Sequence, residues 1–269
     1  MSQEATSVLE CIVNVSEGRD RDVLAALRDA GADDLLDLHV DAHHHRCVLT
    51  TVGEAAARRI ARVAVARVDL RSHVGAHPRL GAVDVVPFVA LDDAMPADAC
   101  AARTRFAAWI ADELAVPAFT YGDGEGVLAL PEVRRRAFVD LWPDTGPDRP
   151  HPTAGAVAVG CRPPLVAYNL WLAEPDLDLA RSVASAVRGD GIRALGLAVG
   201  DRVQVSMNLI DPDRVGPATA YDRVAERAAV AEAELVGLLP RRVLDAVAPE
   251  RWAELDLAAD RTVEARRAR

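Results

Sequence analysis

The sequence of 269 residues contains no lysine, so all of its 31 basic side chains are arginines. Without a lysine amine, neither Schiff-base catalysis nor a lysine clamp on a phosphate is available to the protein. The formal net charge is -10, which argues against a general nucleic-acid binder, because neutralising phosphates requires a basic face. Aromatic residues make up only 4% of the chain, so we expect a core built mainly from alanine, valine and leucine.

Membrane-spanning apolar runs and paired cysteine motifs are also missing. No apolar stretch approaches the roughly 20 residues that a spanning helix needs, and the N-terminus does not resemble a secretion signal. We therefore expect no membrane partner. The sequence has no C-x-x-C pair, and this spacing predicts buried free thiols in a reducing compartment, the cytoplasm. The four cysteines are Cys11, Cys47, Cys100 and Cys161.

Hydrophobic periodicity predicts alternating strands and helices along the chain. Strands are expected at residues 10–15, 35–41, 46–52, 83–91, 117–121, 156–161, 165–172, 192–199 and 203–210. Helices are expected at 19–30, 53–68, 96–114, 131–139, 177–187, 217–235 and 241–247. Strand pairs between helices favour an α+β fold of two α/β sandwich subdomains, each a ferredoxin-like sheet with helices on one face. The Pro-rich segment 142–154 suggests subdomains at 1–154 and 155–269.

All seven histidines lie within the first 151 residues, and a first cluster spans residues 37–46. If strand geometry held there, His39, Asp41 and His43 would share one face. One interpretation is a polar turn between two strands. The other is a metal-dependent hydrolase or lyase that uses these three residues with His73, although no recognised ligand spacing is present.

A second cluster, His73 to Asp84, forms a loop that precedes a predicted buried strand. Proline after His77 holds that histidine in an extended conformation, and the neighbouring glycines allow a ligand to approach the backbone closely. Histidine is the side chain best suited to take and return a proton near neutral pH. The loop is therefore either a catalytic loop or a structural loop whose histidines cap backbone groups.

A third segment lies between the two halves and is either a linker or a binding loop. Its residues are Gly146, Pro147, Asp148, Arg149, Pro150, His151, Pro152, Thr153, Ala154 and Gly155.

The run from His73 to Phe88, HVGAHPRLGAVDVVPF, resembles the signature HKGEHPRMGAxDVxPF of glutamate formiminotransferases. The opening ECIVNVSEG, Glu10 to Gly18, resembles that family's ECVPNFSEG, and Asp41 to Arg46 resembles its DxxHNR turn. Further resemblances occur in chain order over nearly the whole sequence. They lie at 117–122, 146–160, 168–172, 205–209 and 235–240.

The resemblance implies a pair of formiminotransferase subdomains that transfer a formimino group from N-formimino-L-glutamate to tetrahydrofolate. It implies that His77 is the catalytic acid and base, that Asp41 and Arg46 are polar groups of the site, which we expect to be catalytic, and that 146–155 binds folate. Tetrahydrofolate would serve as co-substrate, no metal is expected, and the family precedent suggests a homodimer.

Roles for the remaining polar residues follow from the same chemistry. Asp41 could orient the imidazole or stabilise the cationic amidine. Arg46 and Arg79 are candidates for the substrate carboxylates, because a guanidinium binds a carboxylate through two parallel hydrogen bonds. His44 matches the histidine of the turn motif and is a candidate for substrate binding.

Three positions depart from the family pattern. Val74 stands where the family has lysine, Ala76 where it has glutamate, and His45 where it has asparagine. The first two departures motivate a second alternative, a non-catalytic relative that binds folate.

Overall fold

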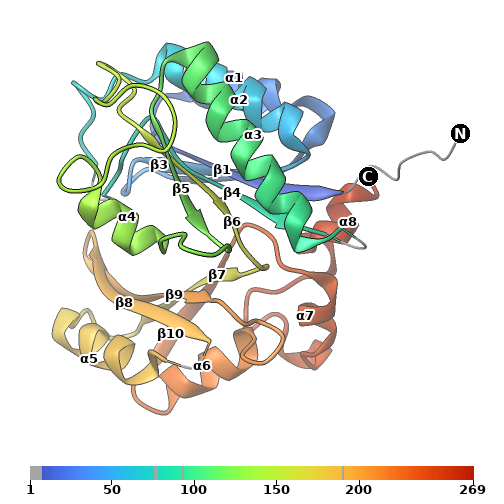
Figure 1. The fold of residues 1–269 in the computed structure, drawn as a ribbon. Helices are drawn as coiled ribbons and strands as arrows, with labels where there is room; N and C mark the ends of the chain where they lie inside the picture. The colour runs from blue at the N-terminus through green and yellow to red at the C-terminus, as the bar shows by residue number, and fades with distance from the viewer. Residues whose placement is uncertain (1–7, 76–77, 92–93, 190) are drawn as a thin grey trace, which may run out of the picture. The chain divides into compact units, whose positions relative to one another are not determined.

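The computed structural model describes residues 8–75, 78–91, 94–189 and 191–269 (Figure 1). The chain divides into two compact units, of which the first ends at Pro163 and the second begins at Pro164. This division falls later than the predicted boundary after residue 154. The reason is that β6 (Val157–Cys161) pairs in parallel with two strands of the first unit.

The first unit starts with a β-α-β-β-α-β arrangement, which is the ferredoxin-like connection. Its elements are β1 (Leu9–Val15), α1 (Arg21–Gly31), β2 (Leu35–Asp41), β3 (Arg46–Val52), α2 (Glu54–Arg67) and β4 (Val83–Ala90). Before β6 come α3 (Pro96–Leu114), β5 (Ala118–Gly122) and α4 (Leu130–Arg136). The sheet order is β2-β3-β1-β4-β6-β5, antiparallel from β2 to β4 and parallel among β4, β6 and β5.

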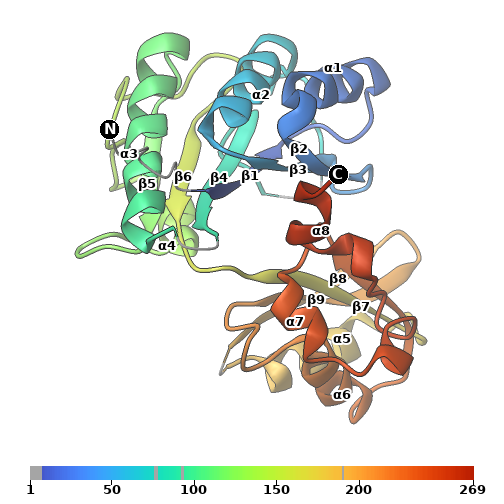
Figure 2. The same ribbon diagram turned by 90° about the vertical axis from the view of Figure 1, so that its right-hand side faces the viewer.

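Helices α1, α2 and α3 lie side by side on one face of the six-stranded sheet (Figures 1 and 2). The buried face of α2 consists of four alanines and Ile60, and such small side chains let the helix pack close to the sheet. Helix α4 belongs to a separate cluster, in which Val133 is buried with Phe119 and Tyr121. The predicted core of small aliphatic residues is confirmed.

The second unit repeats the same connection with four strands. Its elements are β7 (Val166–Leu172), α5 (Leu177–Val187), β8 (Ile192–Val199), β9 (Arg202–Leu209), α6 (Pro217–Ala225) and β10 (Val230–Val236), followed by the short helices α7 (Arg241–Asp245) and α8 (Val263–Arg267). The antiparallel sheet has the order β10-β7-β9-β8, and α5 and α6 cover one face of it (Figure 1). The predicted α+β class with two sheets is confirmed.

The predicted helix over residues 217–235 is wrong. Helix α6 ends at Ala225, and β10 pairs antiparallel with β7, with Glu234 opposite Asn169. Alanine and glutamate favour a helix, but Ala233 and Leu235 alternate with Glu232 and Glu234 and are buried. Pairing and burial at the sheet edge outweigh the weak local preference for a helix.

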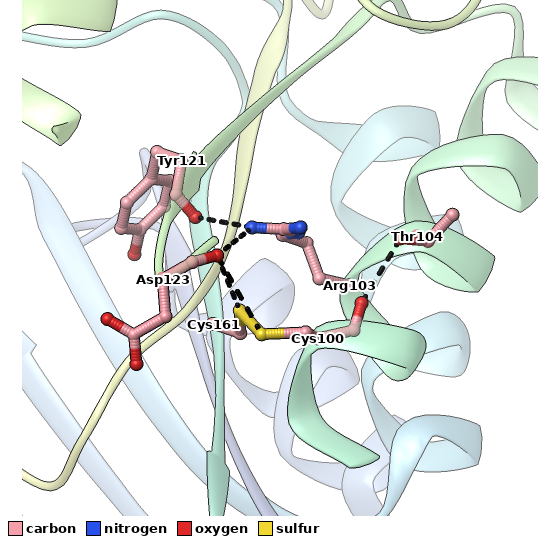
Figure 3. Close-up of a disulfide and its surroundings, with 6 residues drawn as sticks. All are labelled: Cys100, Arg103, Thr104, Tyr121, Asp123 and Cys161. Carbon is pink, nitrogen blue, oxygen red and sulfur yellow. Dashed lines mark hydrogen bonds between the residues drawn. A yellow bond between two sulfur atoms is a disulfide. The ribbon is translucent and has the colours of Figure 1, made fainter. Parts of the chain in front are cut away.

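Two of the four cysteines also differ from the prediction. Cys11 and Cys47 are buried free thiols, as expected, but Cys100 and Cys161 form a disulfide with an S–S distance of 2.14 Å (Figure 3). The bond joins the first turns of α3 to the last residue of β6. Both sulfur atoms lie near the backbone oxygen of Asp123, at 3.8 Å from Cys100 and 3.4 Å from Cys161. A separation of 61 residues leaves no short motif that reveals this pairing.

Within residues 8–75, 78–91, 94–189 and 191–269, no helix combines the length and apolar character needed to cross a membrane.

Candidate active site

Three segments of the first unit converge: the turn after β1, the turn between β2 and β3, and the loop that follows α2. A Cβ atom on Gly18 would lie 2.3 Å from the backbone oxygen of Asp41 and 2.7 Å from the backbone nitrogen of Arg46. Only glycine permits so close an approach. The β2–β3 turn therefore rests directly on the segment around Gly18.

Two histidine rings join the β2–β3 turn to the loop after α2. The rings of His45 and His73 stack with centroids 4.0 Å apart and an interplanar angle of 23°. The amide of Gly18 donates to His45 Nδ1 at 3.1 Å, an arrangement that needs this nitrogen unprotonated. Glu17 Oε1 lies 3.3 Å from the same nitrogen and would favour the protonated ring.

His45 is neutral at pH 7. Burial lowers the pKa of its ring, the positive charges of Arg19 and Arg79 lower it further, and together they outweigh the opposing effect of the Glu17 carboxylate. Burial likewise lowers the pKa of His73, and the neighbouring His45 adds to the effect. The stacked pair is therefore uncharged at neutral pH.

Arginine side chains hold the backbone of the same segments. Arg19 donates to the carbonyl oxygens of Ala42 at 2.8 Å and Val74 at 3.1 Å, and so ties the β2–β3 turn to the loop after α2. Arg79 NH2 donates to the backbone oxygen of His73 at 2.7 Å. These bonds reduce the conformations open to the loop on each side of residues 76 and 77.

Asp41, a predicted catalytic residue, lies at the end of β2 and contacts His44. The Nδ1 atom of His44 is 2.5 Å from Asp41 Oδ2, and the His44 amide donates to Oδ1 at 2.9 Å. Burial acts to raise the pKa of Asp41, but the hydrogen bonds from His44 outweigh it and lower that pKa to about 2. Asp41 is therefore a carboxylate throughout the physiological pH range.

Arg46, also predicted to be catalytic, belongs to a buried charge network. Its NH1 atom lies 2.9 Å from Asp84 Oδ2, and its NH2 atom donates to Asn14 Oδ1 at 2.5 Å. Arg134 of α4 contacts the same oxygen of Asp84 at 2.5 Å, and the Leu80 amide donates to Oδ1 at 2.7 Å. Burial opposes ionisation of Asp84, but the two arginines hold its pKa below the ordinary value.

The C-terminal end of the predicted folate-binding stretch, residues 153–155, contacts the loop after α2. The Ala82 amide donates to the oxygen of Ala154 at 2.9 Å, and the Leu70 amide donates to that of Thr153 at 2.8 Å. A Cβ on Gly81 would lie 2.0 Å from the backbone oxygen of Ala156, so glycine is needed where the segments touch. Residues 148–150 are exposed.

His77, the predicted catalytic histidine, lies outside the described residues. The other predicted residues of this region do come together, because Asp41, His44, Arg46 and Arg79 all lie in the converging segments. In the described part of the chain, no group of three or more His, Cys, Asp or Glu side chains is arranged to hold a metal. The metal-dependent alternative gains no support there.

Several members of the cluster were not predicted as site residues. Asp84 could have been found, because a carboxylate within an otherwise apolar strand must have a partner when buried. Arg134 had no such signal, since it is one of three consecutive arginines in α4. The stack of His45 on His73 joins residues 28 positions apart and required the fold.

Comparison with known proteins covers nine tenths of the chain. Residues 8–162 match the model of the formiminotransferase domain, N-terminal subdomain. A glutamate formimidoyltransferase of Streptococcus pyogenes serotype M1 is 34% identical over 90% of this chain and 92% of its own length. A glutamate formimidoyltransferase of Thermoplasma acidophilum is 33% identical over 90% of this chain and 91% of its own length. The formimidoyltransferase-cyclodeaminase of Sus scrofa is 30% identical over 90% of this chain, which spans 52% of that protein. The chain belongs to the formiminotransferase family.

Proposed function

We propose that the protein transfers the formimino group of N-formimino-L-glutamate to tetrahydrofolate, giving 5-formiminotetrahydrofolate and glutamate. Two relatives named glutamate formimidoyltransferase align over more than nine tenths of their own length. The structural observation that carries the proposal is the convergence of the β2–β3 turn, the loop after α2 and residues 153–156. These are the segments that the family motifs assign to the reaction.

The reaction requires two proton movements at one carbon. Nitrogen N5 of tetrahydrofolate attacks the formimino carbon, and the new C–N bond gives a tetrahedral intermediate. N5 then loses a proton, the glutamate nitrogen gains one, and the bond from the carbon to that nitrogen breaks. We assign both transfers to the imidazole of His77, since a positioned acid and base contributes roughly 10²- to 10⁴-fold.

The ionised carboxylate of Asp41 supplies negative charge beside this chemistry. We propose that it stabilises the cationic amidine, with His44 holding the carboxylate in place through its ring and its amide. A preorganised charge is more effective than a mobile one, because it needs no reorientation during the reaction.

The two candidate arginines take different roles in this proposal. Arg46 lies in the network with Asp84 and Asn14, so its guanidinium acts as a fixed internal charge beneath the site. We therefore assign recognition of the glutamate carboxylates to Arg79, which follows His77 by two residues. Arg79 contacts the backbone of His73, which orients its guanidinium.

Folate binding is assigned to residues 146–155. The segment is attached at both ends, since Thr145 Oγ1 donates to the Ala107 oxygen at 2.9 Å and the Ala156 amide donates to the Leu80 oxygen at 3.0 Å. Exposed residues between two fixed ends suit a loop that contacts a ligand. Tetrahydrofolate is the co-substrate, and no metal takes part in the proposed steps.

The cytoplasm and a homodimer complete the proposal. The Cys100–Cys161 disulfide argues against the cytoplasm, because disulfides persist mainly in oxidising compartments, so the location needs its own test. Trapping thiols with an alkylating agent in the source cell tests the location. Reduced Cys100 and Cys161 would support the cytoplasm, and the oxidised pair would argue for another compartment.

The experiment that tests the function measures glutamate release from N-formimino-L-glutamate with and without tetrahydrofolate. We expect release only when both substrates are present, and we expect a chelator to leave the rate unchanged. N-formyl-L-glutamate serves as a matched donor control that tests donor choice. Calorimetric binding of a reduced folate without turnover would support the non-catalytic alternative that the departures from the family pattern at Val74 and Ala76 motivate.

A further inference from the structure

Arginine side chains from outside the loop hold the backbone on both sides of residues 76 and 77. On the N-terminal side, Arg19 NH1 donates to the oxygen of Val74 at 3.1 Å. On the C-terminal side, Arg134 NH1 donates to the oxygen of Pro78 at 3.1 Å. Arg134 comes from α4, more than fifty residues further along the chain, so nothing local places it there.

The guanidinium of Arg134 makes a second contact that closes a ring of interactions. Its NH2 atom lies 2.5 Å from Asp84 Oδ2, and Asp84 Oδ1 accepts from the amide of Leu80 at 2.7 Å. Pro78, Arg134, Asp84 and Leu80 are thus linked in a closed loop that spans residues 78–84. The planar guanidinium fixes the directions of both of its hydrogen bonds at once.

Charge compensation of Asp84 does not explain Arg134. The Asp84 side chain is 1% exposed and needs a cation, but Arg46 already provides one at 2.9 Å. Two arginines on one carboxylate leave the cluster with a net positive charge, which burial makes unfavourable. A second arginine at this cost is better explained by its geometry.

Attachment of α4 to the sheet does not explain Arg134 either. Val133, the preceding residue, is fully buried and packs with Phe119 and Tyr121. This apolar contact fixes the position of the helix without help from a guanidinium. The remaining effect of the arginine is on the backbone of residues 78–80.

We propose that Arg134 is a positioning residue that, with Asp84, fixes the backbone directly after His77 and so aligns the catalytic imidazole. This inference rests on the proposed role of His77. A misplacement of about 1 Å in a catalytic group can lower the rate roughly a hundredfold. Loosening the backbone next to His77 should therefore lower kcat measurably.

The test compares Arg134→Lys with Arg135→Lys, since Arg135 is the exposed neighbour on the same helix. Lysine keeps the charge next to Asp84 but cannot reproduce the planar pair of hydrogen bonds. For Arg134→Lys we expect kcat to fall roughly tenfold or more while both KM values stay within about threefold. Arg135→Lys should behave as wild type in both parameters.

Two further readouts do not depend on turnover. Hydrogen exchange at the Leu80 amide should accelerate in Arg134→Lys and remain unchanged in Arg135→Lys. The imidazole resonance of His77, identified by its loss in His77→Ala, should shift only in Arg134→Lys. In an Arg134→Met variant, which also lacks the charge, we expect the Leu80 exchange and the His77 resonance to change in the same way as in Arg134→Lys.

The outcomes separate this inference from the proposed function. Wild-type kcat together with unchanged Leu80 exchange in Arg134→Lys would overturn the positioning role, whatever His77 does. Full turnover in His77→Ala would remove the proposed catalytic role, while the exchange and resonance data would still decide whether Arg134 fixes this segment. A loss of thermal stability with unchanged kcat would assign Arg134 a structural role and contradict the inference.

Discussion

The two units share one β-α-β-β-α-β connection but use their charged residues differently. In both, an aspartate caps the first helix, with Asp20 at α1 and Asp176 at α5 accepting from two backbone amides each. In the first unit, Glu10, Glu17 and Asp84 are buried, and arginines from the turn before α1, from β3 and from α4 lie near the loop after α2. The shared scaffold therefore does not account for the charge cluster.

Ion pairs in the second unit lie largely at its surface. In the pairs Arg214–Asp211, Arg241–Asp245 and Arg242–Asp213, every side chain is between 49% and 55% exposed. Exposed pairs contribute little to stability, whereas removing one partner of a buried network leaves an uncompensated charge. The first unit thus contains a buried charge network around Asp84, whereas these pairs of the second unit lie at the surface.

The largest effect on stability is expected from Asp84→Asn in the first unit. This change leaves Arg46 and Arg134 without their shared carboxylate and should lower the free energy of unfolding by about 3–5 kcal/mol. The matched change in the second unit, Asp245→Asn, should cost about 1 kcal/mol or less. Urea unfolding of both variants measures the difference, and equal losses would break the comparison.

The disulfide provides the next largest effect, and it lies only in the first unit. A Cys100→Ser, Cys161→Ser double variant should lose roughly 2–4 kcal/mol, because the bond closes a long loop and restricts the unfolded chain. A reducing agent should lower the melting temperature of the wild type and leave that of the variant unchanged. The same shift in both proteins would mean that another group responds to the reductant.

The smallest expected effect is the dependence of stability on pH. It should come from histidines of the first unit, because the second unit has no histidine. The folded state lowers the pKa of His45 and His73, so as pH falls below about 6.5 the unfolded chain takes up protons first. Stability should therefore decrease between pH 7 and pH 5. A His45→Gln, His73→Gln variant should show a shallower decrease in urea unfolding, and a slope as steep as that of the wild type would exclude these rings as its source.

Most elements of the fold could be predicted from periodicity, because strands β4 and β7 and helices α3 and α5 bury continuous apolar runs or faces. Strand β10 could not, since its alanines and glutamates favour a helix and only pairing with β7 makes them a strand. The disulfide likewise depends on the fold, which brings the start of α3 to the end of β6.

The site could be predicted in part. Motif spacing identified the segments around Asp41, Arg46 and Arg79, and these segments lie together. Motifs do not show which charged groups pair with each other. Only the three-dimensional structure shows that Arg46 and Arg134, the latter from α4, both contact Asp84.

The most direct test of the central claim is tetrahydrofolate-dependent glutamate release by wild type, His77→Ala and His43→Ala, where His43 is an exposed histidine of the β2–β3 turn. We expect His77→Ala to lose at least about a hundredfold in kcat while folate affinity and melting temperature are retained, and His43→Ala to match wild type. Near-wild-type turnover in His77→Ala would contradict the account.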